Sequence, residues 1–184
     1  MIAREEALNL IKKYIRNKDR LKASLAVEAI LKKLARRFEE DEKLWSLTGL
    51  LHNLDYEYTE EDQQNRGKIS TQILDGLIPD EAMKAIQANN YINTDYLPET
   101  SLDKALIAAE AAACLIISTL NASYTRDVED IDIRLLYENF KDESFAPNCN
   151  RDRIKLCNDN ELDVQEFLSI CLDAFVDIKD KLNI

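Results

Sequence analysis

Glycine, proline and histidine are scarce in this chain of 184 residues, which holds three glycines, three prolines and a single histidine. Few turn-forming residues favour helices joined by short loops over a sheet rich in hairpins. One histidine excludes a metal centre that needs several imidazole ligands. The cysteines show no C-x-x-C pair, so we interpret them as small buried side chains or free thiols rather than as a disulfide framework or zinc site. They are Cys114, Cys149, Cys157 and Cys171.

Basic residues are also fewer than acidic ones: the chain has 24 Lys and Arg against 35 Asp and Glu, which gives a formal net charge of −11. Phosphate backbones and anionic membranes repel such a chain, so we expect neither nucleic acid nor a membrane as a general partner. A local basic pocket is still able to bind a small phosphate.

The N-terminus lacks the apolar core of a signal peptide. Residues 105–120 are apolar but interrupted by Glu110, and we expect a buried core helix there, too short and too charged to span a bilayer. These features predict a cytoplasmic protein.

What the chain does have is apolar residues at helical spacing along almost its whole length. We expect Asp41 to cap a helix that ends near residues 53–56, and Asp130 or Asp132 to cap a later one. Pro79 suits the first position of a helix, and Gly76 suits the stop of the preceding one. The pattern predicts an all-α helical bundle that forms a single domain over residues 1–184. The helices are expected near residues 8–15, 21–37, 42–53, 69–75, 79–86, 101–120, 132–140 and 163–182, with a turn around Pro147 and a short segment over 150–157 before the last one.

Residues 50–57 form a recognisable motif, Leu50-Leu51-His52-Asn53-Leu54-Asp55-Tyr56-Glu57. It resembles the signature helix of the HD-domain superfamily of metal-dependent phosphohydrolases, in which a His-Asp pair follows a Leu-Leu run. Here the second member of the pair is an amide, Asn53. The resemblance is strongest over residues 20–120, which would form an HD-like core. Residues 121–184 would then form a C-terminal helical extension packed on that core.

The resemblance implies a helical bundle that directs histidines and carboxylates at one or two divalent metals, which activate water against a phosphate ester. Placed on this chain, most of the family's ligand positions hold other groups. Ala23 and Asn89 stand where the family has histidines, Arg66 stands where the second-metal histidine of an Arg-His-Gly motif would be, and Glu110 replaces an aspartate. The vestigial pocket positions are therefore Ala23, His52, Asn53, Arg66, Asn89 and Glu110.

Only His52 and Glu110 at these positions are still able to ligate a metal, with Asp55 as a weak third remnant, so we predict no catalytic residue, no bound metal and no cofactor. We expect His52 to be a core histidine satisfied by a nearby backbone carbonyl. A carboxylate inside an apolar helix needs a neutralising partner, because burying it alone costs several kcal/mol. We expect Arg66 to pair with Glu110, the rival being that each side chain extends into solvent. Arg66, Tyr91 and Tyr96 are the candidate ligand-contacting residues.

Three functions remain open at this point. The first is an HD-domain-like protein that has lost most metal ligands and acts, without catalysis, by binding a small phosphorylated ligand or a protein partner. The second is a divergent phosphohydrolase that acts on nucleotides or other phosphate esters with one divalent metal, held by His52, Glu110 and Asp55. The third is a structural subunit that forms a homodimer through a helix face.

Overall fold

Helices account for all the regular secondary structure of residues 1–182, the part of the chain that this computed structural model describes. The α-helices are α1 (Arg4–Tyr14), α2 (Lys18–Arg37), α3 (Glu42–Leu51), α4 (Lys68–Leu74), α5 (Asp80–Ala88), α6 (Ser101–Ala122), α7 (Ile133–Lys141), α8 (Arg151–Lys155), α9 (Val164–Asp177) and α10 (Lys179–Leu182). Short 3₁₀ turns cover Tyr56–Tyr58, Gln63–Asn65, Val128–Asp130 and Leu156–Asn160. The predicted all-α bundle is confirmed.

Capping side chains explain where several helices begin. Asp41 accepts hydrogen bonds from the backbone N–H groups of Lys43 and Leu44 and so starts α3, as expected. Asp132, the second of the two candidates, starts α7 in the same way. Pro79 is the N-cap residue of α5, one position earlier than expected. Gly76 follows the end of α4 with a φ of +70°, a left-handed conformation that suits glycine.

The last expected helix is interrupted. We expected one helix over residues 163–182, but α9 ends at Asp177 and α10 starts at Lys179. Ile178, between them, has φ −121° and ψ 12°, which is outside the helical range. Apolar periodicity continues across this break, because Ile178 packs against the core and Leu182 is buried. The periodic pattern therefore did not reveal it.

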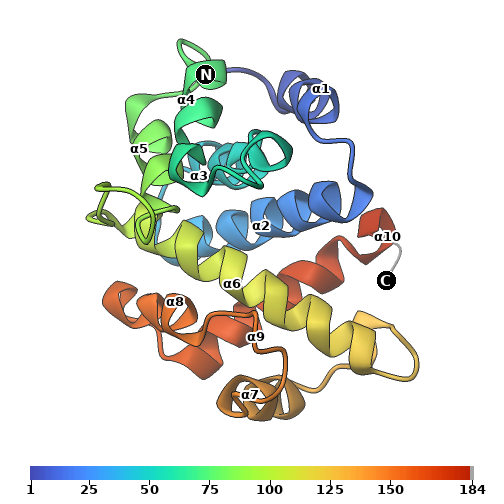
Figure 1. Cartoon of the computed structure of the whole chain (residues 1–184). Helices are drawn as coiled ribbons and strands as arrows, with labels where there is room; N and C mark the ends of the chain where they lie inside the picture. The colour runs from blue at the N-terminus through green and yellow to red at the C-terminus, as the bar shows by residue number, and fades with distance from the viewer. Residues whose placement is uncertain (183–184) are drawn as a thin grey trace.

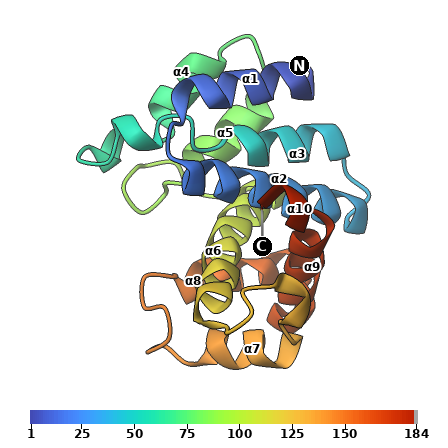
Figure 2. The same cartoon turned by 90° about the vertical axis from the view of Figure 1, so that its right-hand side faces the viewer.

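The helices are arranged on either side of α2 and α6 (Figures 1 and 2). In both views α1, α3, α4 and α5 lie above α2, whereas α7, α8 and α9 lie on the opposite side, around α6. One core of buried side chains includes residues from Ala7 in α1 to Leu182 in α10. Segments 20–120 and 121–182 both contribute to this core.

Helix α6 lies at the centre of the molecule. By length and composition it is apolar enough to cross a membrane, with a mean hydropathy of 1.8 over an 18-residue window, which corrects our expectation that this segment is too short and too charged. Of that window, 67% is buried inside the protein, as expected for a core helix. Its apolar surface is therefore used mainly for packing against the surrounding helices.

Candidate functional site

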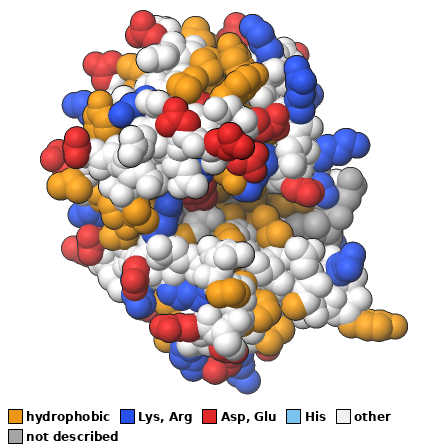
Figure 3. Space-filling view, in the orientation of Figure 1, with side chains coloured by type: hydrophobic (Ala, Val, Ile, Leu, Met, Phe, Trp, Pro, Cys, Tyr) orange, Lys and Arg blue, Asp and Glu red, His pale blue; other side chains and the backbone are white. Residues whose placement is uncertain are grey.

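A cleft of about 530 Å³ lies between α2, the C-terminal end of α3, the middle of α6 and the segment that leads into α8. In Figure 3 the face shown is hollowed across its middle. Five of the six vestigial pocket positions line the cleft, although they are scattered over nearly ninety residues of sequence: Ala23, His52, Asn53, Arg66 and Glu110. The sixth, Asn89, is hydrogen-bonded to Glu110. The structure thus brings the whole predicted set together.

His52 lies at the C-terminal end of α3 and is buried, with 2% of its surface exposed. Its Nδ1 is 2.7 Å from the backbone carbonyl oxygen of Gly49, as expected of a core histidine satisfied by its own helix. A carbonyl only accepts, so Nδ1 carries the proton and Nε2 is left as the acceptor. The Asn53 side-chain amide lies 2.6 Å from Nε2 and donates to it. The nitrogen that a metal would need is therefore already hydrogen-bonded.

Glu110 is the charged centre of the cleft. Its Oε1 accepts a hydrogen bond from Asn53 Nδ2 at 3.1 Å, and its Oε2 accepts one from Asn89 Nδ2, also at 3.1 Å. The third donor is Arg153, whose Nη2 lies 2.6 Å from Oε2. Arg153 Nη2 also donates to Asn89 Oδ1 at 2.7 Å. An arginine and two amides therefore surround this carboxylate.

The pKa of Glu110 reflects two opposing effects. Burial by itself raises the pKa, because it disfavours the charged carboxylate. The positive charge of Arg153 and the hydrogen bond from Asn53 oppose that effect and hold the pKa well below its ordinary value. Glu110 is therefore ionised at neutral pH, and Arg153 is its counter-ion.

The expected pair between Arg66 and Glu110 is wrong. Arg66 Nε donates instead to Thr59 Oγ1 at 3.2 Å, and its guanidinium lies 4.3 Å from the centre of the Tyr56 ring. The guanidinium of Arg20, from the start of α2, lies 3.7 Å from the same ring. We predicted the need for a cation correctly, but not its source. Arg153 is 43 residues from Glu110, and no local pattern links the two.

Three other residues that we selected from the sequence, Asp55, Tyr91 and Tyr96, lie outside the lining of the cleft. Asp55 is fully buried, and its Oδ2 accepts from the backbone N–H groups of Gly67 at 2.7 Å and Ser70 at 2.9 Å, so it fixes the start of α4 and does not line the cleft. Tyr91 and Tyr96 do not line the cleft either, and Tyr96 borders a separate surface hollow. The cleft therefore lacks the Asp55 carboxylate, the third ligand that a one-metal site with His52 and Glu110 would use.

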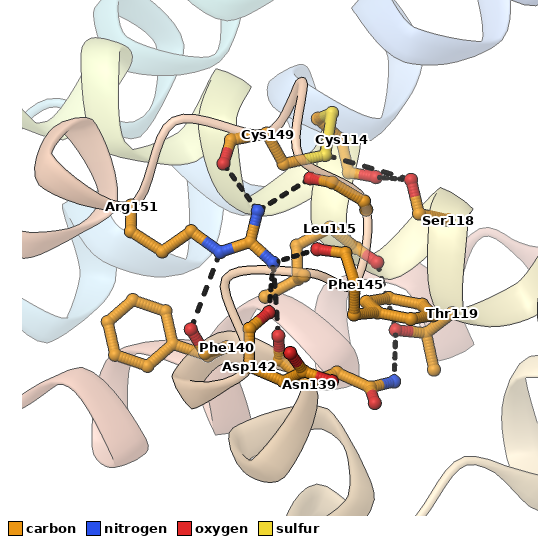
Figure 4. Close-up of a disulfide and its surroundings, with 11 residues drawn as sticks. Cys114, Leu115, Ser118, Thr119, Asn139, Phe140, Asp142, Phe145, Cys149 and Arg151 are labelled. Carbon is orange, nitrogen blue, oxygen red and sulfur yellow. Dashed lines mark hydrogen bonds between the residues drawn. A yellow bond between two sulfur atoms is a disulfide. The ribbon is translucent and has the colours of Figure 1, made fainter.

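The interpretation of the cysteines needs correction as well. Cys114 of α6 and Cys149 form a disulfide, shown in Figure 4. Their Cα atoms are 5.7 Å apart, in the usual range for such a bond. Only Cys157 and Cys171 are free, and both are buried as predicted. The disulfide joins residues 35 apart in sequence, and the sequence offers no spacing motif that would have identified the pair.

Arg151 fixes the loop that carries Cys149. Its guanidinium donates hydrogen bonds to backbone carbonyl groups around the loop, as Figure 4 shows. The oxygen atoms of Ala146 and Cys149 are each 2.6 Å from Nη1. The other acceptors are the carbonyl oxygens of Asn139, Phe140, Asp142 and Phe145. Sequence reasoning missed this residue, because an arginine in a polar segment usually indicates solvent exposure.

Within residues 1–182, no group of three or more His, Cys, Asp or Glu side chains lies close enough together to hold a metal ion. Comparison of the chain with protein-family models, with curated proteins and with solved structures finds no match.

Proposed function

We propose that this protein is an HD-domain-like binding protein that holds a small phosphorylated ligand in the cleft and does not hydrolyse it. The observation that carries the proposal is the ion pair between Arg153 and Glu110. An HD-type hydrolase would use the carboxylate at this position for a divalent metal. Here a guanidinium of the chain already neutralises it.

The convergence of the six predicted positions supports the HD-like part of the proposal. The resemblance selected Ala23, His52, Asn53, Arg66, Asn89 and Glu110 from the sequence alone. These residues come from different helices and loops, yet five of them line one cleft and the sixth contacts Glu110. His52 also keeps a feature typical of metal-binding histidines, a backbone carbonyl that orients the ring through Nδ1.

The charge of the cleft supports a phosphorylated ligand. Three arginines line it, Arg20, Arg66 and Arg153, against two carboxylates, those of Asp19 and Glu110, in a protein whose net charge is −11. Among the residues described, Arg20 and Arg66 form no ion pair and contact Tyr56 instead. Guanidinium groups without a carboxylate partner bind phosphate oxygens well, because their planar fork fits two oxygens at once.

Two polar atoms of the cleft residues lack a hydrogen-bond partner within residues 1–182. Asn53 Oδ1 and Arg153 Nε are buried and have no hydrogen-bond partner in the described part of the protein. A buried polar atom without a partner costs on the order of 1–3 kcal/mol. Both atoms are closed off from the cleft surface, so a ligand reaches them only if neighbouring side chains move.

Thermal-shift and calorimetric titration with inorganic phosphate and AMP tests this function. We expect a saturable rise in melting temperature, equivalent to about 2.7 kcal/mol at a hundredfold excess over Kd. The R20Q and R66Q variants should each bind about tenfold more weakly, since each loses a charge-assisted hydrogen bond. The matched control is R134Q, because Arg134 is exposed on α7, away from the cleft.

The same measurements with EDTA and with Mn²⁺ distinguish binding from hydrolysis. We expect no change of melting temperature with EDTA or with Mn²⁺, and no release of phosphate from AMP. Two results would reject the proposal. One is the absence of a shift with either phosphate compound. The other is phosphate release that depends on Mn²⁺ and disappears in H52A, which would establish the one-metal hydrolase instead.

A further inference from the structure

Two neighbouring connections, one ionic and one covalent, join α6 to the segment around α8. On α6, Glu110 and Cys114 are four residues apart and so lie on the same helix face, one turn from each other. Their partners, Arg153 and Cys149, are also four residues apart. One connection is the ion pair between Glu110 and Arg153, and the other is the Cys114–Cys149 disulfide. The disulfide therefore helps to hold Arg153 against Glu110.

The disulfide is placed where a reagent in the cleft can approach it. Both of its cysteines line the cleft, and Cys114 is partly exposed, whereas 3% of Cys149 is exposed. The two free cysteines differ in this respect. Burial raises the pKa of Cys157 to about 12 and that of Cys171 well above its ordinary value, so neither forms the reactive thiolate at neutral pH. Thiol chemistry in this chain is thus concentrated at the cleft.

We propose that Cys114–Cys149 is a site of thiol–disulfide exchange entered from the cleft, whose reduction by a dithiol loosens the α8 segment and weakens the hold of Arg153 on Glu110. This inference goes beyond ligand binding, because it concerns what controls the shape and charge of the cleft. It does not depend on the identity of any ligand.

The exchange proceeds in two balanced steps. A thiolate of the dithiol attacks the Sγ of Cys114, the more exposed of the two residues, and forms a mixed disulfide with it, while the Cys114–Cys149 bond breaks and Cys149 leaves as a thiolate. Ser118 Oγ lies 3.7 Å from Cys149 Sγ and is able to turn its hydroxyl proton toward that thiolate (Figure 4). The second thiol of the reagent, once deprotonated, attacks its own sulfur in the mixed disulfide and releases the Cys114 thiolate. The protein gains two electrons and two protons, and the dithiol becomes a disulfide.

Arg151 limits how far the change spreads. It continues to donate to the carbonyl oxygens of Ala146 and Cys149 when the sulfur bond is broken, because these hydrogen bonds involve only the backbone of the loop. We therefore expect the loop to keep its fold. Movement should concentrate where α8 packs against α6.

Alkylation and mass spectrometry test the disulfide itself. In protein purified without reductant and then denatured, two of the four cysteines should react with iodoacetamide, and peptide mapping should find Cys114 and Cys149 protected. After treatment of the folded protein with dithiothreitol, all four should react under the same denaturing conditions. Four reactive cysteines in the untreated protein, or a bond that dithiothreitol does not open without denaturant, would overturn the proposal.

Hydrogen exchange tests the consequence for the cleft. The amides of residues 150–156 should exchange at least tenfold faster in the reduced protein, while those of α2 and α3 stay unchanged. The C114S variant should behave like reduced protein and the C157A variant like oxidised protein. Reduced wild-type protein provides the same comparison if C114S does not fold. Equal exchange in both redox states would refute the coupling, whether or not the cleft binds phosphate.

Discussion

Arg153 Nη2 lies 2.6 Å from Glu110 Oε2, so a guanidinium from the short helix α8 neutralises the carboxylate in the middle of the apolar helix α6. The side chains are 17% and 30% exposed, which makes this pair far drier than a surface salt bridge. In such a setting the loss of one partner costs more than the loss of both, because the remaining charge stays buried.

A double-mutant cycle measures this relationship. We expect E110Q and R153M each to lower the free energy of unfolding by about 2–4 kcal/mol at pH 7, since each leaves one polar or charged partner unmatched. The double variant should be more stable than the sum of the single effects predicts, with a coupling free energy of about 1–3 kcal/mol. Urea unfolding followed by circular dichroism gives these values. Additive effects would show that the two groups do not depend on each other.

Glu110 also predicts a dependence of stability on pH. Its pKa is lowered in the folded protein, by Arg153 and by the hydrogen bond from Asn53, against the effect of burial. The stabilisation that ionised Glu110 provides is therefore fully present above the pKa of a glutamate in the unfolded chain, about 4.3. It is lost as the pH falls from that value through the lower pKa of Glu110 in the folded protein. The difference in unfolding free energy between wild type and E110Q should be constant from pH 7 to about pH 5 and shrink below about pH 4.

Urea titrations at a series of pH values between 7 and 3 would measure that trend. The control is D152N, because Asp152 is exposed and its ion pair with Lys155 is at the surface. Its effect should stay within about 0.5 kcal/mol at every pH. A difference between wild type and E110Q that grows as the pH falls would contradict the expected direction of the effect.

The contact between α2 and α3 depends on Gly49. A Cβ atom at this position would lie 2.8 Å from the carbonyl oxygen of Val27 and 3.0 Å from the Cα of Glu28, both backbone atoms of α2. Alanine favours helix by about 1 kcal/mol over glycine, but here the two helices would have to separate. We expect G49A to destabilise the protein by about 1–3 kcal/mol in urea unfolding. S46A, three residues earlier in α3, should change stability by less than about 0.5 kcal/mol.

Arg151 should not be replaceable by lysine. The guanidinium donates through three nitrogen atoms to carbonyl oxygens that include those of Phe140, Ala146 and Asp142, and an ammonium group presents its donors from a single point. We expect R151K to lower the free energy of unfolding by about 1–3 kcal/mol, because several part-buried carbonyls lose their donor. Hydrogen exchange should quicken in residues 142–149. R134K, on the exposed side of α7, should leave both measurements unchanged.

Local patterns in the sequence predicted most of the fold. Apolar spacing located the helices, and the Asp41 cap was correct because capping depends on neighbouring residues. The break at Ile178 was missed, since the side chains on both sides of it still face the core. The clustering of His52, Asn53 and Glu110 was predicted through the family resemblance. It could not have been obtained from helical periodicity, which says nothing about how helices are placed in space.

The partners of these site residues were predicted less well. The chain offers 24 Lys and Arg side chains to neutralise Glu110, and the selection of Arg153 depends on how α8 packs beside α6. The disulfide depends on the same packing. Both errors concern pairs distant in sequence, where local chemistry sets a requirement and only the tertiary structure decides which residue meets it.

The guanidinium of Arg153 has a consequence for protein engineering. Placing an aspartate at residue 53 and histidines at residues 23 and 89 would give the chain ligand types that the HD-domain resemblance implies. The fixed positive charge beside Glu110 would still repel an incoming dication and compete for its oxygens. A designer who wanted to recreate a catalyst from this scaffold would have to remove that arginine first.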